Sequence, residues 1–223
     1  MNEQEGTRTM FQVRFHGRGG QGVVTAAELL ASAAFREDRH AQAFPSFGSE
    51  RMGAPVMSFC RIDDKPIRTH EPVTEPDALI IQDPTLLHQA DIFGGFRGDQ
   101  GFAPPGQQSA GLGVGGYMLV NSARGFGELG LDEFVQGFHR DRLLVVPASS
   151  LAMTHLGRPL PGAALLGGFA ALTWAVSLDS VLAAINERFS GKVAEGNAAA
   201  ARAAFDFVRD EREALTRKAK ADA

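Results

Sequence analysis

The chain has 223 residues, 44% of them apolar, a size and composition that one α/β domain with a buried core can fill. Its formal net charge is −4 and its basic residues are scattered, so the cationic surface typical of nucleic-acid-binding proteins is not expected. The single cysteine, Cys60, excludes a disulfide framework, a zinc site built on paired cysteines and an iron–sulfur cluster held by this chain alone, and it favours a reducing, cytoplasmic location.

Neither the N-terminus nor the uncharged segment 159–178 has the pattern of a targeting signal or a membrane span. Residues 1–9 are polar and acidic, and we predict a flexible tail there. Residues 159–178 are long enough to cross a bilayer, but alanine, glycine and two prolines make up much of the segment. We therefore predict a buried, tightly packed helix, and neither a membrane nor a nucleic acid as a partner.

The first predicted unit is a strand, a glycine loop and a helix. Residues 10–16 alternate apolar and polar side chains, as in a strand with one buried face. The glycine-rich residues 17–22 follow, and residues 23–35 repeat apolar side chains at the three- and four-residue spacing of a helix. This order predicts a β–α unit at the start of the domain.

Further β-rich runs predict a sheet covered on both faces, because several are apolar throughout. They are residues 41–44, 56–62, 78–83, 117–123 and 143–149. Asp63 and Asp64 form a turn signal, so one antiparallel edge strand or hairpin is allowed. The expected fold is a three-layer, Rossmann-like α/β sandwich with a mostly parallel sheet.

The C-terminal part is predicted to be rich in helix, over residues 163–177, 178–189 and 194–215. We expect a domain over 10–208 followed by a charged helical tail over 209–223. Residues 98–116 are rich in glycine and proline without periodicity, which is typical of a lid, a contact arm or a disordered loop.

The glycine loop fits the G-x-G-x-x-G pattern, whose backbone N–H groups can face a phosphate at the start of a helix. The candidate ligand-binding residues are Arg18, Gly19, Gly20, Gln21 and Gly22. A nicotinamide cofactor would need an acidic residue at the end of the second strand, where Phe44 and Pro45 stand instead. Three hypotheses remain: a diphosphate-type ligand, a nicotinamide dinucleotide, or glycines that only allow close packing.

No catalytic or metal-ligating set is predicted. The six histidines are scattered, and only Asp91 after His88 approaches a ligand spacing. No serine lies in a G-x-S-x-G elbow, and Cys60 lies within a strand, where a buried thiol is the ordinary case.

Residues 44–55 form a second unusual stretch, a loop with aromatic, arginine and methionine side chains at the carboxyl end of a strand. Such loops carry function in open α/β sheets, but this composition equally suits a subunit interface, which we favour. The candidate interface residues are Phe44, Phe47, Glu50, Arg51 and Met52.

Three segments together resemble the gamma subunit of the pyruvate synthase group, the 2-oxoacid:ferredoxin (acceptor) oxidoreductases. They are "HGRGGQGVVTAAELLA", "AQAFPSFGSERMGAPVMSFCRIDDKPI" and "PDALIIQDPTLL", and the resemblance runs from about Phe11 to about Phe207. The chain departs from the family at residues 98–116 and in its N-terminal extension.

The resemblance implies a complex that decarboxylates a 2-oxoacid on thiamine diphosphate with magnesium. It also implies electron transfer to [4Fe–4S] clusters and acyl transfer to coenzyme A. The implied partners are alpha, beta and cluster-carrying delta subunits, with ferredoxin as acceptor, or NAD through a further flavoprotein chain.

This chain carries neither the family's thiamine motif nor the thiolates of a cluster. The family's thiamine diphosphate sites use a GDG motif, which the closest string here, residues 98–101, does not match. We therefore expect the chain to be inactive alone, with roles in assembly and in part of the coenzyme A site. The alternatives are a pure scaffold subunit and a free-standing dinucleotide-binding oxidoreductase. The sequence does not identify the 2-oxoacid.

Overall fold

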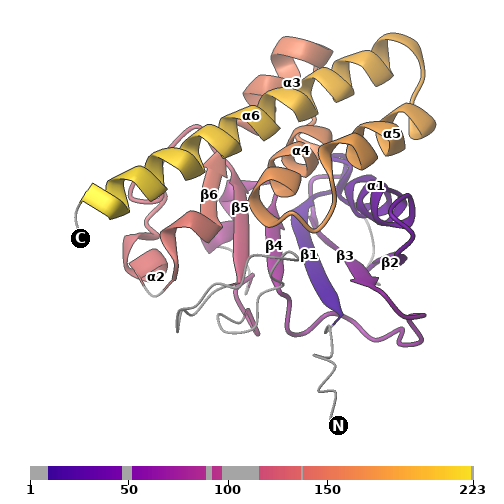
Figure 1. Cartoon of the computed structure of the whole chain (residues 1–223), viewed down its shortest axis with the longest axis horizontal. Helices are drawn as coiled ribbons and strands as arrows, with labels where there is room; N and C mark the ends of the chain where they lie inside the picture. Colours follow the sequence, from indigo (N-terminus) through magenta and orange to yellow (C-terminus); the bar gives the residue numbers. More distant parts are fainter. Residues whose placement is uncertain (1–9, 47–51, 89–91, 97–115, 137, 222–223) are drawn as a thin grey trace, which may run out of the picture.

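The computed structural model describes residues 10–46, 52–88, 92–96, 116–136 and 138–221 (Figure 1). The predicted tail over 1–9 and most of the glycine- and proline-rich stretch 98–116 lie outside these residues.

One six-stranded sheet forms the centre of the fold, in the order β2-β3-β1-β4-β5-β6. The strands are β1 (Phe11–Arg18), β2 (His40–Pro45), β3 (Pro55–Asp63), β4 (Ala78–Ile81), β5 (Tyr117–Asn121) and β6 (Leu143–Val146). Strands β1, β4, β5 and β6 pair in parallel, whereas β3 is antiparallel to both β1 and β2. The mostly parallel sheet is thus confirmed, and its reversed strand lies second from the edge.

Both faces of the parallel strands are buried, as their apolar runs predicted. In β4, Ala78 and Ile80 contribute to one hydrophobic core, and Leu79 and Ile81 to a second core on the opposite face. The polar residue Gln82 follows at the carboxyl end of β4, and the strand stops at Ile81, short of the predicted run 78–83.

The face of the sheet that carries Ala78 and Ile80 is covered by most of the helices (Figure 1). They are α1 (Val23–Phe35), α3 (Ala148–Leu156), α4 (Gly162–Thr173), α5 (Leu178–Arg188) and α6 (Gly191–Ala221). Helix α4 lies at the centre of this layer, and residues 163–173 are all buried, which confirms the predicted buried helix. Within the described part of the chain, no helix combines the length and apolar character needed to cross a bilayer.

The second face has a thinner cover over β4, β5 and β6. It consists of the short helices η1 (Pro84–His88), α2 (Asp132–Gln136) and η2 (Arg140–Arg142), with partly buried phenylalanines packed beneath them. Phe134 lies between Phe93 and Phe138, with ring centroids 4.3 and 4.9 Å away. The α/β sandwich is therefore confirmed, with layers of unequal thickness.

Two boundaries differ from the sequence predictions. The run 143–149 was predicted as strand throughout, but β6 ends at Val146 and α3 begins at Ala148. Pro147 has no N–H to donate in a β ladder, and proline is well tolerated at the start of a helix. Helix α6 continues without a break through the predicted domain boundary at residue 208, and Leu215 still packs against the core. The separate tail over 209–223 stays a prediction.

Candidate functional site

The glycine loop joins β1 to α1 at the carboxyl edge of the parallel strands. Gly20 (φ 92°) and Gly22 (φ 74°) adopt left-handed backbone conformations, which favour glycine. Gly22 is the N-cap of α1 and provides no side-chain cap. The first N–H groups of α1 therefore lack the side-chain acceptor that usually covers them.

Gly17 has a different role, which is packing. A Cβ at this position would lie 2.6 Å from Cγ2 of Val23 and 3.2 Å from Cβ of Gln82. The missing side chain lets α1 approach β1 and β4 closely. The packing hypothesis therefore explains the first glycine of the motif, but it does not explain the two left-handed glycines that follow.

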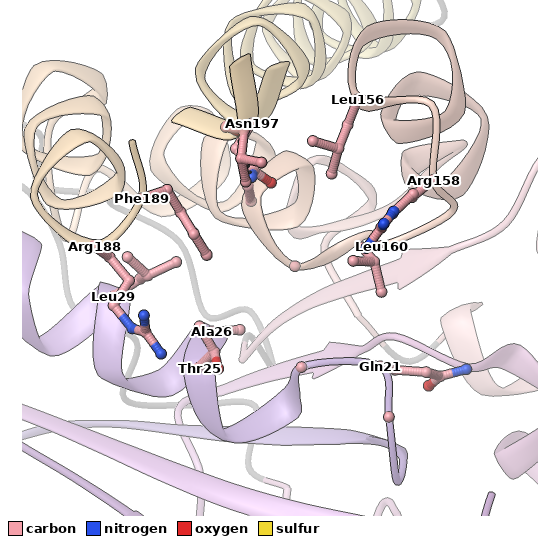
Figure 2. Close-up of a pocket in the computed structure, with 15 residues that line it drawn as sticks. Gln21, Thr25, Ala26, Leu29, Leu156, Arg158, Leu160, Arg188, Phe189 and Asn197 are labelled. Atoms are coloured by element: carbon pink, nitrogen blue, oxygen red, sulfur yellow. Dashed lines mark hydrogen bonds between the residues drawn. The ribbon is translucent and has the colours of Figure 1, made fainter. Parts of the chain in front are cut away.

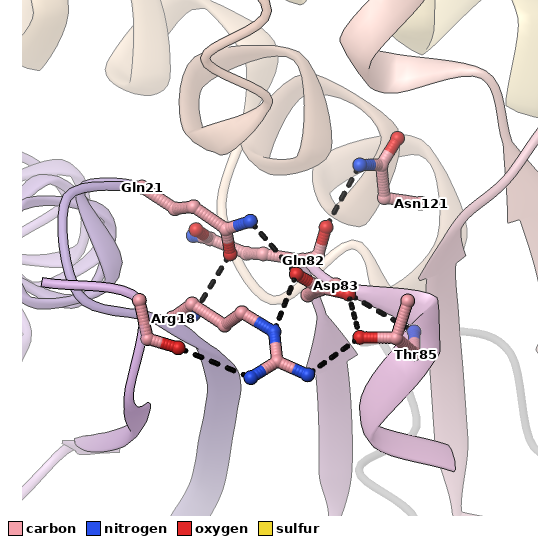
Figure 3. A network of polar contacts seen from close by, with 7 residues as sticks. Arg18, Gln21, Gln82, Asp83, Thr85 and Asn121 are labelled. Carbon is pink, nitrogen blue, oxygen red and sulfur yellow. Dashed lines mark hydrogen bonds and ion pairs between the residues drawn. The ribbon is translucent and has the colours of Figure 1, made fainter. Parts of the chain in front are cut away.

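Asp83 fixes the loop from below (Figure 3). Its Oδ2 accepts hydrogen bonds from Arg18 Nε (3.1 Å) and Gln21 Nε2 (2.9 Å). Its Oδ1 accepts from the backbone N–H (2.9 Å) and the hydroxyl (2.6 Å) of Thr85. Burial alone would raise the pKa of Asp83, but the hydrogen bonds from Thr85 and Gln21 and the charge of Arg18 together hold its pKa below the usual value.

The side chains of Arg18 and Gln21 are thus part of an internal network. The other guanidinium nitrogens of Arg18 donate to the carbonyl of Gly53 (3.1 Å) and the hydroxyl of Thr85 (2.7 Å). Gln21 Oε1 accepts from the backbone N–H of Arg18 (2.8 Å). These contacts hold the loop in shape, so the groups best placed for a ligand are backbone N–H groups. A direct contact from either side chain to a ligand stays a prediction.

Residues 52–54 of the candidate interface stretch lie beside the glycine loop. The N–H of Gly19 donates to the carbonyl of Ala54 (2.9 Å), and the N–H of Gly53 donates to the carbonyl of Gly19 (3.1 Å). Met52 is 90% exposed at this junction, as an interface residue would be in the free chain.

The other interface candidates are only partly placed. Phe44 packs against Phe59, with 5.1 Å between ring centroids, and beneath the guanidinium of Arg61. Phe47, Glu50 and Arg51 lie outside the described residues. The interface therefore stays a prediction.

A cavity of about 440 Å³ opens behind the loop, between α1, the α3–α4 connection, the end of α5 and the start of α6 (Figure 2). Leu29, Leu156, Leu160, Phe189 and Val193 form its apolar wall. The sequence did not reveal this cavity, because its lining comes from segments far apart in the chain.

Two arginines flank the cavity, and a buried amide lies near its floor. Arg158 and Arg188 stand on opposite sides in Figure 2. Gln82 is 1% exposed, and neither atom of its side-chain amide has a hydrogen-bond partner among the described residues. Its Nε2 lies 3.7 Å from the position that a Cβ of Gly162 would occupy, next to the start of α4. Such orphaned amides are rare in protein interiors, so this one fits a site that a polar ligand completes.

No catalytic group emerges elsewhere among the described residues. Burial raises the pKa of the Cys60 thiol, and burial together with the charge of Arg14 lowers the pKa of His16 to about 3. Among these residues, no three His, Cys, Asp or Glu side chains come together as a metal site would require.

The fold and site define a class: a Rossmann-like α/β chain that presents a glycine loop and an uncapped helix N-terminus at the carboxyl edge of its parallel strands. The chain belongs to the pyruvate ferredoxin/flavodoxin oxidoreductase family, whose model matches residues 12–207. This match confirms the resemblance carried by the three sequence segments.

The chain is similar in sequence to curated relatives over nearly their whole length. The chain is 44% identical to the pyruvate/ketoisovalerate oxidoreductases common subunit gamma of Thermococcus kodakarensis, covering 88% of this chain and 96% of the relative. It is 41% identical to the pyruvate synthase subunit PorC of Methanothermobacter marburgensis, over 90% of this chain and 98% of the relative. The crystal structure of the pyruvate oxidoreductase subunit PORC of Thermotoga maritima superposes with a TM-score of 0.69 at 29% identity. The superposition covers 89% of this chain and 97% of the Thermotoga chain. The chain is therefore of the gamma type within its family.

Proposed function

We propose that this chain is the gamma subunit of a cytoplasmic 2-oxoacid:acceptor oxidoreductase complex, and that it contributes assembly contacts and part of the coenzyme A site. The observation that carries the second role is the uncapped N-terminus of α1 behind two left-handed glycines, opening towards an apolar cavity. Helix N-termini of this kind favour phosphate groups, and coenzyme A combines phosphates with a long uncharged arm.

Coenzyme A supplies the thiol that accepts the acyl group in such a complex. In this proposal the residues of this chain bind coenzyme A and orient it. The backbone N–H groups of residues 20–25 face its phosphates, and Asp83 holds the glycine loop in the conformation that exposes these N–H groups. Thiamine diphosphate, magnesium and the clusters belong to partner chains in this proposal, since the family's thiamine motif does not match and one cysteine cannot hold a cluster.

Selection of the 2-oxoacid also belongs to partner chains in this proposal. The Thermococcus relative is named as a subunit common to pyruvate and ketoisovalerate oxidoreductases. A chain shared between enzymes for two different 2-oxoacids does not distinguish their side chains, and the same division of labour applies here.

Purification of the native complex through a tag on this chain tests the proposal. We expect several co-purifying chains, 2-oxoacid-dependent dye reduction by the complex, and none by the isolated chain. An active single chain would instead favour a free-standing oxidoreductase.

The scaffold alternative needs a separate test, because Gly17 does serve packing. In the reconstituted complex, Gly20→Ala places a side chain at a left-handed position beside the proposed phosphate site. We expect the KM for coenzyme A to rise while the KM for the 2-oxoacid stays constant. A normally assembled Gly20→Ala complex with an unchanged KM for coenzyme A would support the scaffold role alone.

A further inference from the structure

We propose that the groove between the end of α4 and the C-terminal half of α6 is a docking surface for an acidic segment of a partner subunit. Trp174 is its apolar anchor, and Arg212 and Arg217 are its cationic residues. The inference rests on the proposed function for the origin of the segment, because that function places the chain in a complex. It adds a second contact surface, which shares no residue with the candidate interface 44–55, and it names the chemistry of the partner that this surface fits.

The groove lies along α6, beside the point where α4 ends. Its volume is about 540 Å³, and α6 continues past it to the C-terminal turns drawn in yellow in Figure 1. Ala171, Trp174 and Phe205 form its apolar part, and residues of α6 after 208 supply the rest. The match with the family model ends at residue 207, so most of this surface lies beyond the matched residues.

The backbone of Trp174 has a conformation that favours glycine. Its φ is 57°, and within the described part of the chain Asp38 is the only other non-glycine residue with a positive φ. Groups other than the indole hold this turn: the N–H of Trp174 donates to the carbonyl of Ala170 (3.0 Å), and the N–H of Ala175 donates to the hydroxyl of Thr173 (3.1 Å). Glycine would satisfy the turn without strain. The indole is nevertheless 51% exposed in the lining of the groove, so the fold alone does not explain it.

Arg212 has a guanidinium whose donors are incompletely satisfied. Its Nη1 donates to the carbonyl of Ala171 (2.9 Å), which fixes the side chain beside the end of α4. Its Nε is buried and has no hydrogen-bond partner among the described residues. Its Nη2 lies 3.9 Å from the carboxylate of Asp141, beyond hydrogen-bond distance. A carboxylate brought into the groove would therefore find a cation that is already in place.

The charge of the groove is positive overall. Arg217 is exposed and forms no ion pair with another residue that the structure describes. Arg209 is neutralised, because it pairs with Asp206 (2.9 Å) and Asp210 (3.0 Å). Glu213 is the one acidic side chain among the three arginines of the lining. The whole chain has a net charge of −4, so a positive groove on it favours an acidic partner.

The composition of the groove fits a protein partner. Tryptophan and arginine are enriched where protein–protein contacts are strongest, and lysine, which such contacts deplete, is missing from the lining. A second copy of the chain is a poor occupant, since a symmetric contact would bring arginines against arginines. The net charge of −4 and the carboxylates beside Arg209 disfavour a nucleic acid. The occupant that fits is a polypeptide segment with carboxylates beside an apolar side chain.

Trp174 provides a direct test, because it is the only tryptophan of the chain. Biosynthetic labelling with 5-hydroxytryptophan gives Trp174 a fluorescence that can be excited apart from the tryptophans of partner chains. Acrylamide quenching of this fluorescence is then compared between the isolated chain and the reconstituted complex. We expect strong quenching in the isolated chain, where the indole is half exposed, and clearly weaker quenching in the complex. Equal quenching in the two states would overturn the inference.

Two variants separate docking from folding. Trp174→Gly removes the indole where glycine suits the backbone, so the thermal midpoint of the isolated chain should change little. The Kd of the chain for its partners, measured by mass photometry of the diluted complex, should rise about thirtyfold, as for the loss of a hot-spot side chain. Arg217→Glu should raise this Kd about tenfold, and its effect should shrink at high salt. The matched control is Arg202→Glu, an exposed arginine of α6 outside the groove, which should leave the Kd unchanged.

Four results would count against the inference. An unchanged Kd in both groove variants would refute the docking surface and keep the proposed function. Equal losses in Arg217→Glu and Arg202→Glu would refute the acidic segment, because a general change of charge would then explain both. Shielding of Trp174 that grows with the concentration of the isolated chain would assign the groove to a second copy instead. If no other chain co-purifies with the wild type, the inference and the proposed function fail together.

Discussion

Asp83 organises the glycine loop, and Asp83→Asn tests how much of the loop's stability depends on its charge. The carboxylate is largely buried and accepts four hydrogen bonds, one of them from the guanidinium of Arg18. Asparagine has nearly the same shape as aspartate but carries no charge. Its NH₂ group would face hydrogen-bond donors, whose hydrogen bonds it cannot accept. A charge-assisted hydrogen bond contributes roughly 1.5–3 kcal/mol, and a partly buried ion pair that loses one charge leaves the other uncompensated. We expect the free energy of unfolding to fall by about 3 kcal/mol.

The assay is urea unfolding of the full chain at pH 7, with Asp64→Asn as the matched control. Asp64 forms an ion pair with Arg39 at the same N···O distance, 3.1 Å, but 35% of its side chain is exposed, compared with 12% for Asp83. Exposed pairs contribute about 0–1 kcal/mol, so the control should lose little. Equal losses in the two variants would refute the argument that burial makes the Asp83 network strong.

The pH dependence provides a second check on Asp83. Its pKa in the folded chain lies below the ordinary value of 3.8, so its stabilisation is complete above that value and disappears as the pH falls through the folded pKa. Asp83→Asn should remove this acid-side contribution. Identical acid unfolding curves for wild type and variant would show that the network contributes nothing below pH 4.

Three further predictions use other parts of the structure. Gly17→Ala places a methyl group 2.6 Å from Val23 and should lower the free energy of unfolding by about 1–3 kcal/mol, measured by thermal melting; an unchanged melt would refute the packing role. Burial raises the pKa of Asp77 to about 6, so between pH 3.8 and about 6 the folded chain keeps a proton that the unfolded chain releases. The free energy of unfolding should therefore decrease as the pH rises from 3.8 to about 6. Asp77→Asn should remove that fall, and a fall that persists in the variant would rule out Asp77 as its source. Arg51→Glu should release the chain from its partners without unfolding it, and unchanged co-purification would argue against the interface.

The strands and α1 could be predicted because their patterns are local. Alternation over 10–16 and apolar spacing over 23–35 depend only on neighbouring residues, and both elements are present. The position of β3 was harder, since Asp63 and Asp64 indicate a turn but not the strand beside which the chain returns. The start of helix α3 was missed because the predicted strand 143–149 was extended past Pro147, although the aliphatic residues end at Val146.

The sequence predicted only part of the site, because the residues that support the glycine loop come from the segment that directly follows β4. Parallel pairing of β1 with β4 brings Gln82 and Asp83 beneath a loop more than sixty residues earlier in the chain. The motif identified the glycines, whereas the charge that holds them and the unpaired amide beside them required the sheet order. The same sheet order pairs Arg18 with Asp83, a contact that the motif did not indicate, and a contact of Arg18 with a ligand stays a prediction.

The small residues that argued against a membrane span in 159–178 also explain how the cavity is formed. A Cβ on Gly167 would collide with the carbonyl oxygen of Ala201, so α6 crosses α4 in close backbone contact. Near the start of α6, a Cβ on Gly196 would lie 2.8 Å from the carbonyl oxygen of His155, so α6 also closes on the end of α3. These two contacts fix the N-terminal part of α6 beside α1 and the start of α4, where the side chains of Val193 and Asn197 complete the cavity wall. Glycine and alanine in α4 therefore serve the packing that places the proposed ligand site, and larger apolar residues at these positions would move α6 away from it.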